Sequence, residues 1–258
     1  MKQIKEIWAY REMIAGLVRR DLRGRYKGSV LGFLWTFINP FLQLMVYTMV
    51  FSIILRSNIE KYYLHLFVTL IPWMFFSNSV AGGCSCVLGQ QGMVTKIYFP
   101  REVLPIAHVV SGFVNMLYCF VVVLAVVLFS GTTISLAAIA TLPLIMIIEL
   151  ILCLGICFLV SSISVYFRDM AHMMGIMIMA WQFLTPIMYS IDAVPENLRG
   201  LFYANPMTFV SIAYRDILYY GRVPEFATLG TSLLVGIVLL VVGYLVFGKL
   251  KRGFAEQL

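Results

Sequence analysis

The sequence predicts an all-α membrane protein, on three observations. The chain is 61% hydrophobic and only 12% charged, whereas soluble domains are about 45–50% apolar and about 25% charged. Its mean hydropathy is +0.92. Long stretches also lack charged side chains, and a bilayer-spanning helix requires about 20 mostly apolar residues. Together these features exclude a soluble globular domain, a disordered chain and a nucleic-acid-binding module.

The charge-free stretches predict six transmembrane helices. Residues 103–148 contain no Lys, Arg, Asp or Glu but are too long for one helix, so a turn is expected at 130–133. The predicted spans are 28–55, 62–95 with a small and polar end, 103 to the turn, 136–166, 170–189 and 226–248. They occupy residues 29–248 of a single permease-like domain, between an interface segment (1–28) and a tail (249–258). The first 27 residues are too charged to contain the apolar core of a cleavable signal peptide.

The distribution of basic residues predicts the orientation of these spans. Six spans place both termini on one side of the membrane. Of the 19 Lys and Arg residues, 14 fall on that side, within 1–29, 91–104, 166–170 and 249–258, and five fall on the other. Because basic residues concentrate in cytoplasmic loops, both termini are expected in the cytoplasm. The net charge of +7 is therefore a signal of topology and of contact with lipid headgroups.

Two segments are predicted to be helical without crossing the membrane. Residues 3–20 place apolar side chains on one helical arc, as expected for a helix lying in the headgroup plane: Ile4, Ile7, Trp8, Ile14, Leu17 and Val18. A topogenic leader explains the same segment. The outer loop 190–225 is expected to form two short helices, one opened by Pro195 and one by Pro206 after Asn205. They are too short to span, so they are re-entrant or gate elements, or an ordinary outer loop at the interface.

No catalytic, cofactor or metal site is predicted. The chain lacks the G-x-x-x-x-G-K-[ST] phosphate-binding loop, so we expect no ATP hydrolysis by this subunit alone. The three His residues are scattered, and the five Cys residues lie in apolar runs where they resemble small buried hydrophobes. Glu149 is the one acid deep inside a predicted span. It is either a proton-coupling site or, as we favour, a buried hydrogen-bonding partner of a neighbouring helix.

Four sequence segments resemble the permease subunits of type-2 ABC exporters for polysaccharides, the family that exports O-antigen, capsular polysaccharide and teichoic acid. They are RRDLRGRYKGSVLGFLWTFINP (19–40), KIYFPREVLP (96–105), YFRDM (166–170) and TPIMYSIDAVP (185–195) followed by NP (205–206). They occur in the family's order, and the resemblance covers essentially the whole chain, including its length and span count.

The resemblance implies a mechanism and its partners. Such permeases form homodimers docked on two separate ATPase subunits, which bind ATP and Mg. The dimer encloses a channel for a polysaccharide attached to undecaprenyl diphosphate, and it resides in the bacterial cytoplasmic (inner) membrane. This chain is therefore expected to be a multi-pass protein with no enzymatic activity or cofactor of its own. Its partners would be a second copy, the ATPase, the lipid-linked polymer and membrane lipids, and no nucleic acid.

The same resemblance assigns residues to four regions. The ATPase-coupling loop, at about 91–102, includes Lys96, Ile97, Tyr98, Phe99, Arg101 and Glu102. The channel-lining aromatic residues are Phe33, Phe37, Tyr47, Phe51 and Trp73. The outer gate, at about 195–204 and 207–220, includes Pro195, Phe202, Tyr203, Pro206 and Arg215. Basic residues at the cytoplasmic mouth of the first span are expected to meet the lipid diphosphate or anionic headgroups: Arg19, Arg20, Arg23, Arg25 and Lys27.

Three alternatives remain open from the sequence. A type-2 permease for drugs or small lipids shares the same architecture. A membrane-embedded lipid-linked sugar transferase requires clustered carboxylates or His residues at one membrane face, whereas the acids here are dispersed. A non-transporting membrane scaffold requires neither gate helices nor a partner ATPase.

Overall fold

The computed structural model describes residues 2–25 and 27–257, and within those ranges it is helical with no β-strand. The all-α prediction is confirmed. The helices are α1 (Lys2–Ala9), α2 (Arg11–Gly24), α3 (Trp35–Thr48), α4 (Tyr62–Cys86), α5 (Gln91–Lys96), α6 (Val103–Phe129), α7 (Leu136–Tyr166), α8 (Met170–Phe183), α9 (Glu196–Tyr203), α10 (Pro206–Leu218), α11 (Phe226–Leu250) and α12 (Phe254–Gln257). The turn Gly32–Leu34 precedes α3, and a π-helical segment, Met49–Ile54, continues it. Met1, Tyr26 and Leu258 of the predicted terminal segments lie outside the described residues, as does the side chain of Ile4.

Five helical segments are long and apolar enough to cross a membrane: Gly32–Ile54, Tyr62–Cys86, Val103–Phe129, Leu136–Tyr166 and Phe226–Gly253. The predicted helix over 170–189 is wrong in its length, because α8 ends at Phe183 after 14 residues. A 14-residue helix is about 21 Å long, less than the roughly 30 Å hydrocarbon core. The helix stops where Thr185 precedes Pro186, a position at which the α conformation is disfavoured.

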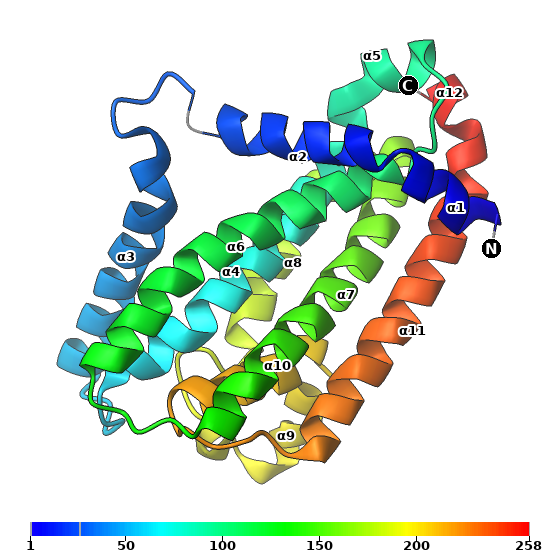
Figure 1. Ribbon diagram of the computed structural model, residues 1–258. Coiled ribbons are helices and arrows are strands. Elements are labelled where there is room, and N and C mark those ends of the chain that lie inside the picture. Colours follow the sequence, from blue (N-terminus) through cyan, green and yellow to red (C-terminus); the bar gives the residue numbers. More distant parts are fainter. Residues whose placement is uncertain (1, 26, 258) are drawn as a thin grey trace.

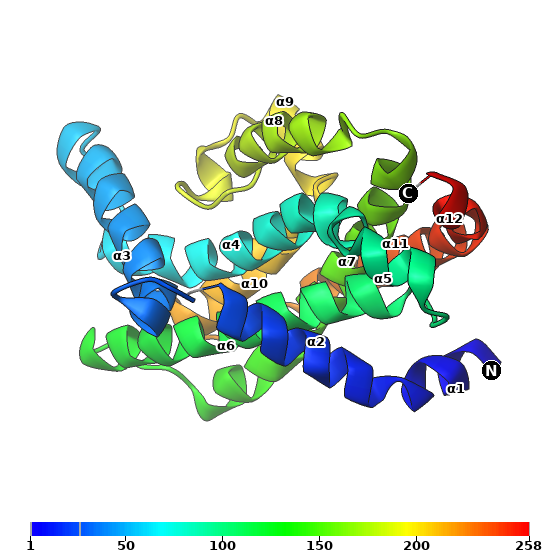
Figure 2. The ribbon, with the colours of Figure 1, turned by 90° about the horizontal axis from the view of Figure 1, so that it is seen from above.

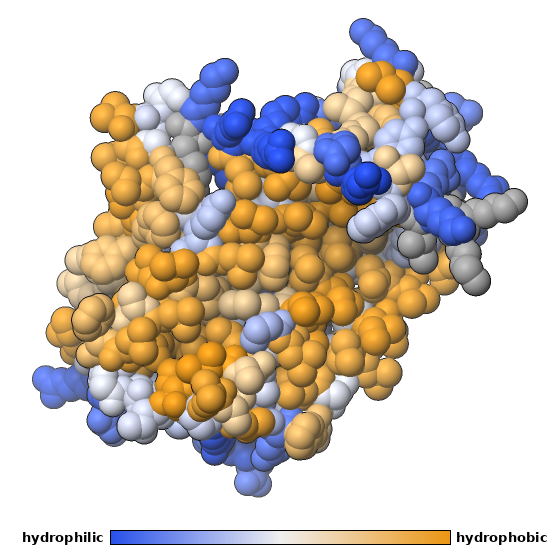
Figure 3. Space-filling model, in the orientation of Figure 1, coloured by the Kyte–Doolittle hydropathy of each residue, from blue (hydrophilic) through white to orange (hydrophobic). Residues whose placement is uncertain are grey.

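The long helices form a tilted bundle with short helices at both ends (Figure 1). Helix α2 lies across one end, close to α5 and both chain termini, whereas α9 and α10 lie at the opposite end (Figure 1). Helix α3 lies at the edge of the bundle, with one end beside α4 and α6 and the other leaning away, as the view from above also shows (Figure 2). The surface has a broad hydrophobic band between hydrophilic ends (Figure 3). This pattern matches a bilayer crossed by the long helices, with α2 at one interface.

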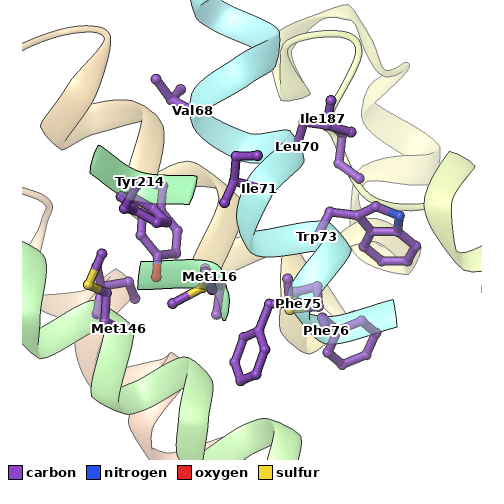
Figure 4. Close-up of a cluster of buried hydrophobic side chains, with 14 of the residues drawn as sticks. Val68, Leu70, Ile71, Trp73, Phe75, Phe76, Met116, Met146, Ile187 and Tyr214 are labelled. Carbon is purple, nitrogen blue, oxygen red and sulfur yellow. The ribbon is translucent and has the colours of Figure 1, made fainter. Parts of the chain in front are cut away.

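Helix α4 is the centre of the core, because it packs against α3, α6, α7, α8 and α10. Large side chains from these elements surround it (Figure 4). The labelled residues on α4 are Val68, Leu70, Ile71, Trp73, Phe75 and Phe76, and those from other segments are Met116, Met146, Ile187 and Tyr214. Burial of these aromatic and aliphatic groups, each in contact with several neighbours, fixes α4 as the element on which the others are positioned.

Small residues allow α7 and α11 to pack closely. A Cβ atom on Gly155 would lie 2.5 Å from the backbone nitrogen of Leu240, and one on Gly243 would lie 2.2 Å from the carbonyl oxygen of Gly155. Close approach of this kind is the usual basis of helix association in membranes, where van der Waals packing replaces the hydrophobic drive. Four Cys residues are buried and Cys86 is half-buried, all of them free thiols, as expected for small apolar side chains.

The predicted interface helix is two helices, α1 and α2, which meet at Tyr10. Ile14 and Leu17 of α2 pack against a hydrophobic cluster of Val87, Phe99 and their neighbours. Trp8, placed on the same predicted apolar arc, is instead 70% exposed. The break turns α1 relative to α2, so a single helical arc over 3–20 does not describe the segment.

Candidate coupling and transport sites

The predicted coupling loop divides into an exposed tip and a buried base. The tip consists of Lys96, at the end of α5, with Ile97 and Tyr98, which is 88% exposed. Phe99 turns inward and is buried with Val94 and Phe247. The loop therefore presents a cation and two apolar side chains to the outside while an aromatic anchor holds its base.

The base of the loop is fastened to the C-terminal segment. Lys251 Nζ makes an ion pair with Oε1 of Glu102, a buried carboxylate. The Arg101 guanidinium donates to the Lys251 carbonyl and lies over the Phe254 ring, 5.8 Å from its centroid. Tyr166 donates a 2.8 Å hydrogen bond from its hydroxyl to the Leu250 carbonyl. Arg101 and Glu102 thus bind this chain's own C-terminal segment, whereas the tip remains exposed.

The role of Lys251 and Phe254 was missed from sequence. Both lie in the segment interpreted as a basic cytoplasmic tail. Phe254 is the one aromatic residue of this segment, which indicates burial, but its partner in space is not readable from one sequence.

All five basic residues predicted at the mouth of the first span are exposed. Arg19, Arg20, Arg23 and Lys27 line one open hollow between α2, the turn at Gly32–Leu34 and α6, which also contains Phe33 and Tyr118. The structure thus brings predicted diphosphate-binding cations and one predicted channel aromatic to the same place. Their like charges create a local positive potential suited to anionic groups.

Arg25 differs from the other four cations because it is paired. Its Nη2 donates to Oδ2 of Asp21 at 3.0 Å, and Ser111 of α6 donates to the same carboxylate oxygen. Partial burial raises the pKa of Asp21, but the Ser111 hydrogen bond and the Arg25 charge outweigh it, so the net pKa lies below the ordinary value. This Asp21–Ser111 contact fixes α2 to α6.

The five predicted channel aromatics do not share one surface. Phe33 packs edge-on against Phe37, at 5.4 Å between centroids, and against Tyr118 at 5.3 Å. Phe51 stacks on Tyr62 at 6.1 Å. Trp73 is buried beside Phe76 in the core, so on a single chain it lines no open surface.

Tyr47 connects the outlying helix α3 to α8. Gln182 of α8 donates a 2.9 Å hydrogen bond to the Tyr47 hydroxyl, and Gln43 donates to it at 3.3 Å. Gln182 was not singled out from sequence. The contact places a small polar cluster between two helices of the hydrophobic band.

Helices α9 and α10, at the end of the bundle opposite α2, begin close to their predicted starts, with Pro195 directly before α9 and Pro206 opening α10. Asn205 caps α10 by accepting from Met207 N at 2.9 Å, and it accepts from Trp181 Nε1 at 2.6 Å. Phe202 packs against Tyr189, and Tyr203 stacks on Phe209.

Arg215, predicted in the outer gate, is buried within the chain. It is only 3% exposed, and it donates to the carbonyl of Pro186 at 2.6 Å and to that of Ile187 at 3.3 Å. These carbonyls belong to the segment that follows α8, where no helix satisfies them. Arg215 therefore fastens α10 to the end of α8.

Glu149 has the hydrogen-bonding role that we favoured from sequence. Oε2 of this carboxyl accepts a 2.7 Å hydrogen bond from the Tyr214 hydroxyl of α10. The buried hydrogen bond with a neighbouring helix, which the favoured interpretation of Glu149 requires, is present.

These features define a polytopic helical membrane protein with a basic interface helix at one end and short packed helices at the other. The chain belongs to the ABC-2 type transporter family, which its residues 13–219 match. It is similar over its full length, at 34% identity, to all of the O-antigen export system permease protein RfbA of Myxococcus xanthus. At 32% identity, 96% of this chain matches 95% of the protein of the same name from Klebsiella pneumoniae. At 21% identity, 89% of it matches 90% of the polysialic acid transport protein KpsM of Escherichia coli.

Proposed function

We propose that this chain is the permease subunit of an ATP-driven exporter that moves an undecaprenyl-diphosphate-linked polysaccharide out of the cytoplasm. The observation that carries the proposal is full-length similarity to an O-antigen export permease, at 34% identity. The basic hollow under α2 supports a substrate with an anionic lipid carrier, because guanidinium groups bind phosphate oxygens by charge and by hydrogen bonds.

In this proposal the chain crosses the membrane six times, with both termini in the cytoplasm. Helix α7 ends at the end of the molecule that carries the termini, and α11 begins at the opposite end (Figure 1). The segment between them, with α8, must therefore cross the band once. Helix α8 supplies about 21 Å of that distance, and the non-helical residues 184–190 complete it. Helices α9 and α10 then form the outer gate.

ATP and Mg belong to two partner subunits, and a second copy of the permease completes the channel. The exposed tip Lys96, Ile97 and Tyr98 is the surface for the ATPase. Helix α3, which stands apart and exposes Phe41 and Met45, supports packing against the second copy. ATP binding by the partner drives transport only if its contacts differ between the closed and open channel.

The test is export in cells. The gene is deleted in its host, and surface polysaccharide is measured with and without a plasmid copy of the permease. Loss of surface polymer, with intracellular accumulation of the lipid-linked form and restoration by the plasmid, is the expected result. Normal surface polymer in the deletion strain, together with altered efflux of drugs or small lipids, would instead favour the alternative type-2 permease.

A further inference from the structure

A polar groove lies among α3, α4 and α6, just beneath the end of α2. Its volume is about 420 Å³, and its polar lining includes Arg25, Thr36, Asn39, Asn78, His108 and Asn115. Each of the three helices contributes one asparagine. Amide side chains at membrane depth are costly unless they meet polar partners, so their convergence from three separate helices requires an explanation.

The polar groups extend from the α2 end toward the middle of the hydrophobic band. Asn78 lies eight residues before Cys86, the last residue of α4, which corresponds to about 12 Å along the helix. Asn115 lies twelve residues after Val103, the first residue of α6, or about 18 Å. Arg25, at the end of α2, is at the mouth. The polar groups of the groove therefore extend about 12–18 Å along α4 and α6 from the helix ends nearest α2.

Several of these groups have no partner in the described part of the chain. Thr36 is 2% exposed and its hydroxyl makes no hydrogen bond there. The side-chain amides of Asn39 and Asn78 make none within those residues either, and both side chains are exposed to the groove. The Cε1–Nε2 edge of the His108 imidazole lies against Gly82, where a Cβ atom would come within 2.4 Å of Cε1. The absence of a side chain at Gly82 therefore makes room for the imidazole in the groove wall.

The lining chemistry selects the kind of ligand. Amides both donate and accept hydrogen bonds, which suits hydroxyl groups. Arg25 and the neighbouring basic hollow under α2 suit phosphate oxygens. Trp35 and Phe75 add aromatic surface to the same groove. A headgroup that carries both phosphate and sugar hydroxyls meets all three features while its lipid chains remain in the bilayer.

We propose that this groove binds the phosphate-and-sugar headgroup of a lipid in the cytoplasmic leaflet, before the lipid reaches the path between the two copies of the chain. This inference rests on the proposed function, since it names where that substrate is first held. Clamped to α6 by Asp21 and Ser111, α2 covers the mouth of the groove and keeps the cations beside it.

The experiment measures lipid binding to the purified full-length permease, without its ATPase. The probe is a short-chain polyprenyl diphosphate bearing one N-acetylglucosamine, and the comparison lipid is phosphatidylglycerol. Native mass spectrometry counts retained lipid for the parent, for Asn39→Leu and Asn78→Leu, and for Asn197→Leu on the exposed face of α9 as a matched control. Loss of one or two amide contacts is expected to weaken probe retention about tenfold in the groove variants and leave the control unchanged.

A second measurement uses the unaltered protein, so it does not require the variants to fold. The same probe with a photoreactive sugar is cross-linked to the unaltered protein and the modified peptides are mapped. Cross-links in α3, α4 and α6 are expected. Cross-links confined to other helices, equal retention of phosphatidylglycerol, or unchanged binding in both asparagine variants would overturn the groove assignment. Polysaccharide export by the complete transporter with the parent chain is measured separately. If the groove assignment is wrong, this export remains intact. If the proposed function is wrong, the parent chain exports no polysaccharide.

Discussion

The Tyr214 hydroxyl donates a 2.7 Å hydrogen bond to Oε2 of Glu149, and both side chains are fully buried between α10 and α7. Oε1 of the same carboxyl has no partner among the described residues. This contact joins the short helix α10 to α7, the longest helix in the described part of the chain. Whether Glu149 must ionise for transport decides if this contact is a structural link or a proton-coupling site.

Replacing Glu149 with Gln tests that distinction. The amide oxygen still accepts from Tyr214, so we expect a folded permease and nearly normal export. A proton relay requires an ionisable group, and the amide is not one. Export is measured as surface polysaccharide, and complete loss of it in a normally folded variant would establish the coupling role instead.

Tyr214→Phe is the matched change on the other side of the contact. It leaves a buried carboxyl with no hydrogen-bond donor, which costs about 1–3 kcal/mol. We expect a lower thermal unfolding midpoint in detergent for Tyr214→Phe than for Glu149→Gln. Equal midpoints for the two variants and the parent would show that the contact does not stabilise the fold.

Charge reversal at the tip of the coupling loop is expected to weaken docking of the ATPase. Lys96 is exposed, and its side chain makes no hydrogen bond or ion pair within the described residues, so Lys96→Glu changes the surface and leaves the fold intact. Co-purification of the tagged ATPase is the measurement. Lys249→Glu, another exposed lysine at the same end of the molecule, is the control. Equal ATPase recovery with both variants would remove Lys96 from the docking surface.

The Lys251–Glu102 ion pair is expected to hold the C-terminal segment against the coupling loop. Glu102 is 2% exposed, so Lys251→Met leaves an unpaired buried carboxylate, at a cost of about 1–3 kcal/mol. The double variant Lys251→Met/Glu102→Gln removes that charge and is expected to recover part of the loss. Protease sensitivity of the C-terminus and the unfolding midpoint report both effects. If the single and double variants lose the same stability, the pair is not coupled.

The orientation of the chain is tested with two introduced cysteines at opposite ends. Tyr203 of α9 is 42% exposed and Tyr98 of the coupling loop is 88% exposed. A membrane-impermeant thiol reagent is expected to label Tyr203→Cys in intact cells, and Tyr98→Cys only after the membrane is permeabilised. The native thiols are buried or half-buried, so the background is expected to be low. Labelling in the reverse order would invert the proposed topology.

The sequence alone determined the helical class, five of the spans and the paired short helices before the last span. Each of these features is local. A long charge-free stretch in the bilayer must satisfy its backbone hydrogen bonds within a helix, and Asn205 followed by Pro206 starts a new helix. The end of α8 was missed because the apolar stretch continues past Phe183, whereas Pro186 and the buried Arg215 hold the following residues out of the helix.

Only the tertiary structure decided which side chains meet. Lys251 was interpreted as one charge of a basic tail, yet it pairs with Glu102, 149 residues earlier. Arg215 was predicted at the outer gate from its place in the chain, and the structure adds that it binds the Pro186 carbonyl, just after α8. Asn39, Asn78 and Asn115 lie in three different spans, and their common groove exists only because α3, α4 and α6 pack around it. Hydropathy and charge act along the chain and so can be read from it, whereas these contacts depend on helix rotation and tilt, which the packing of the whole bundle sets.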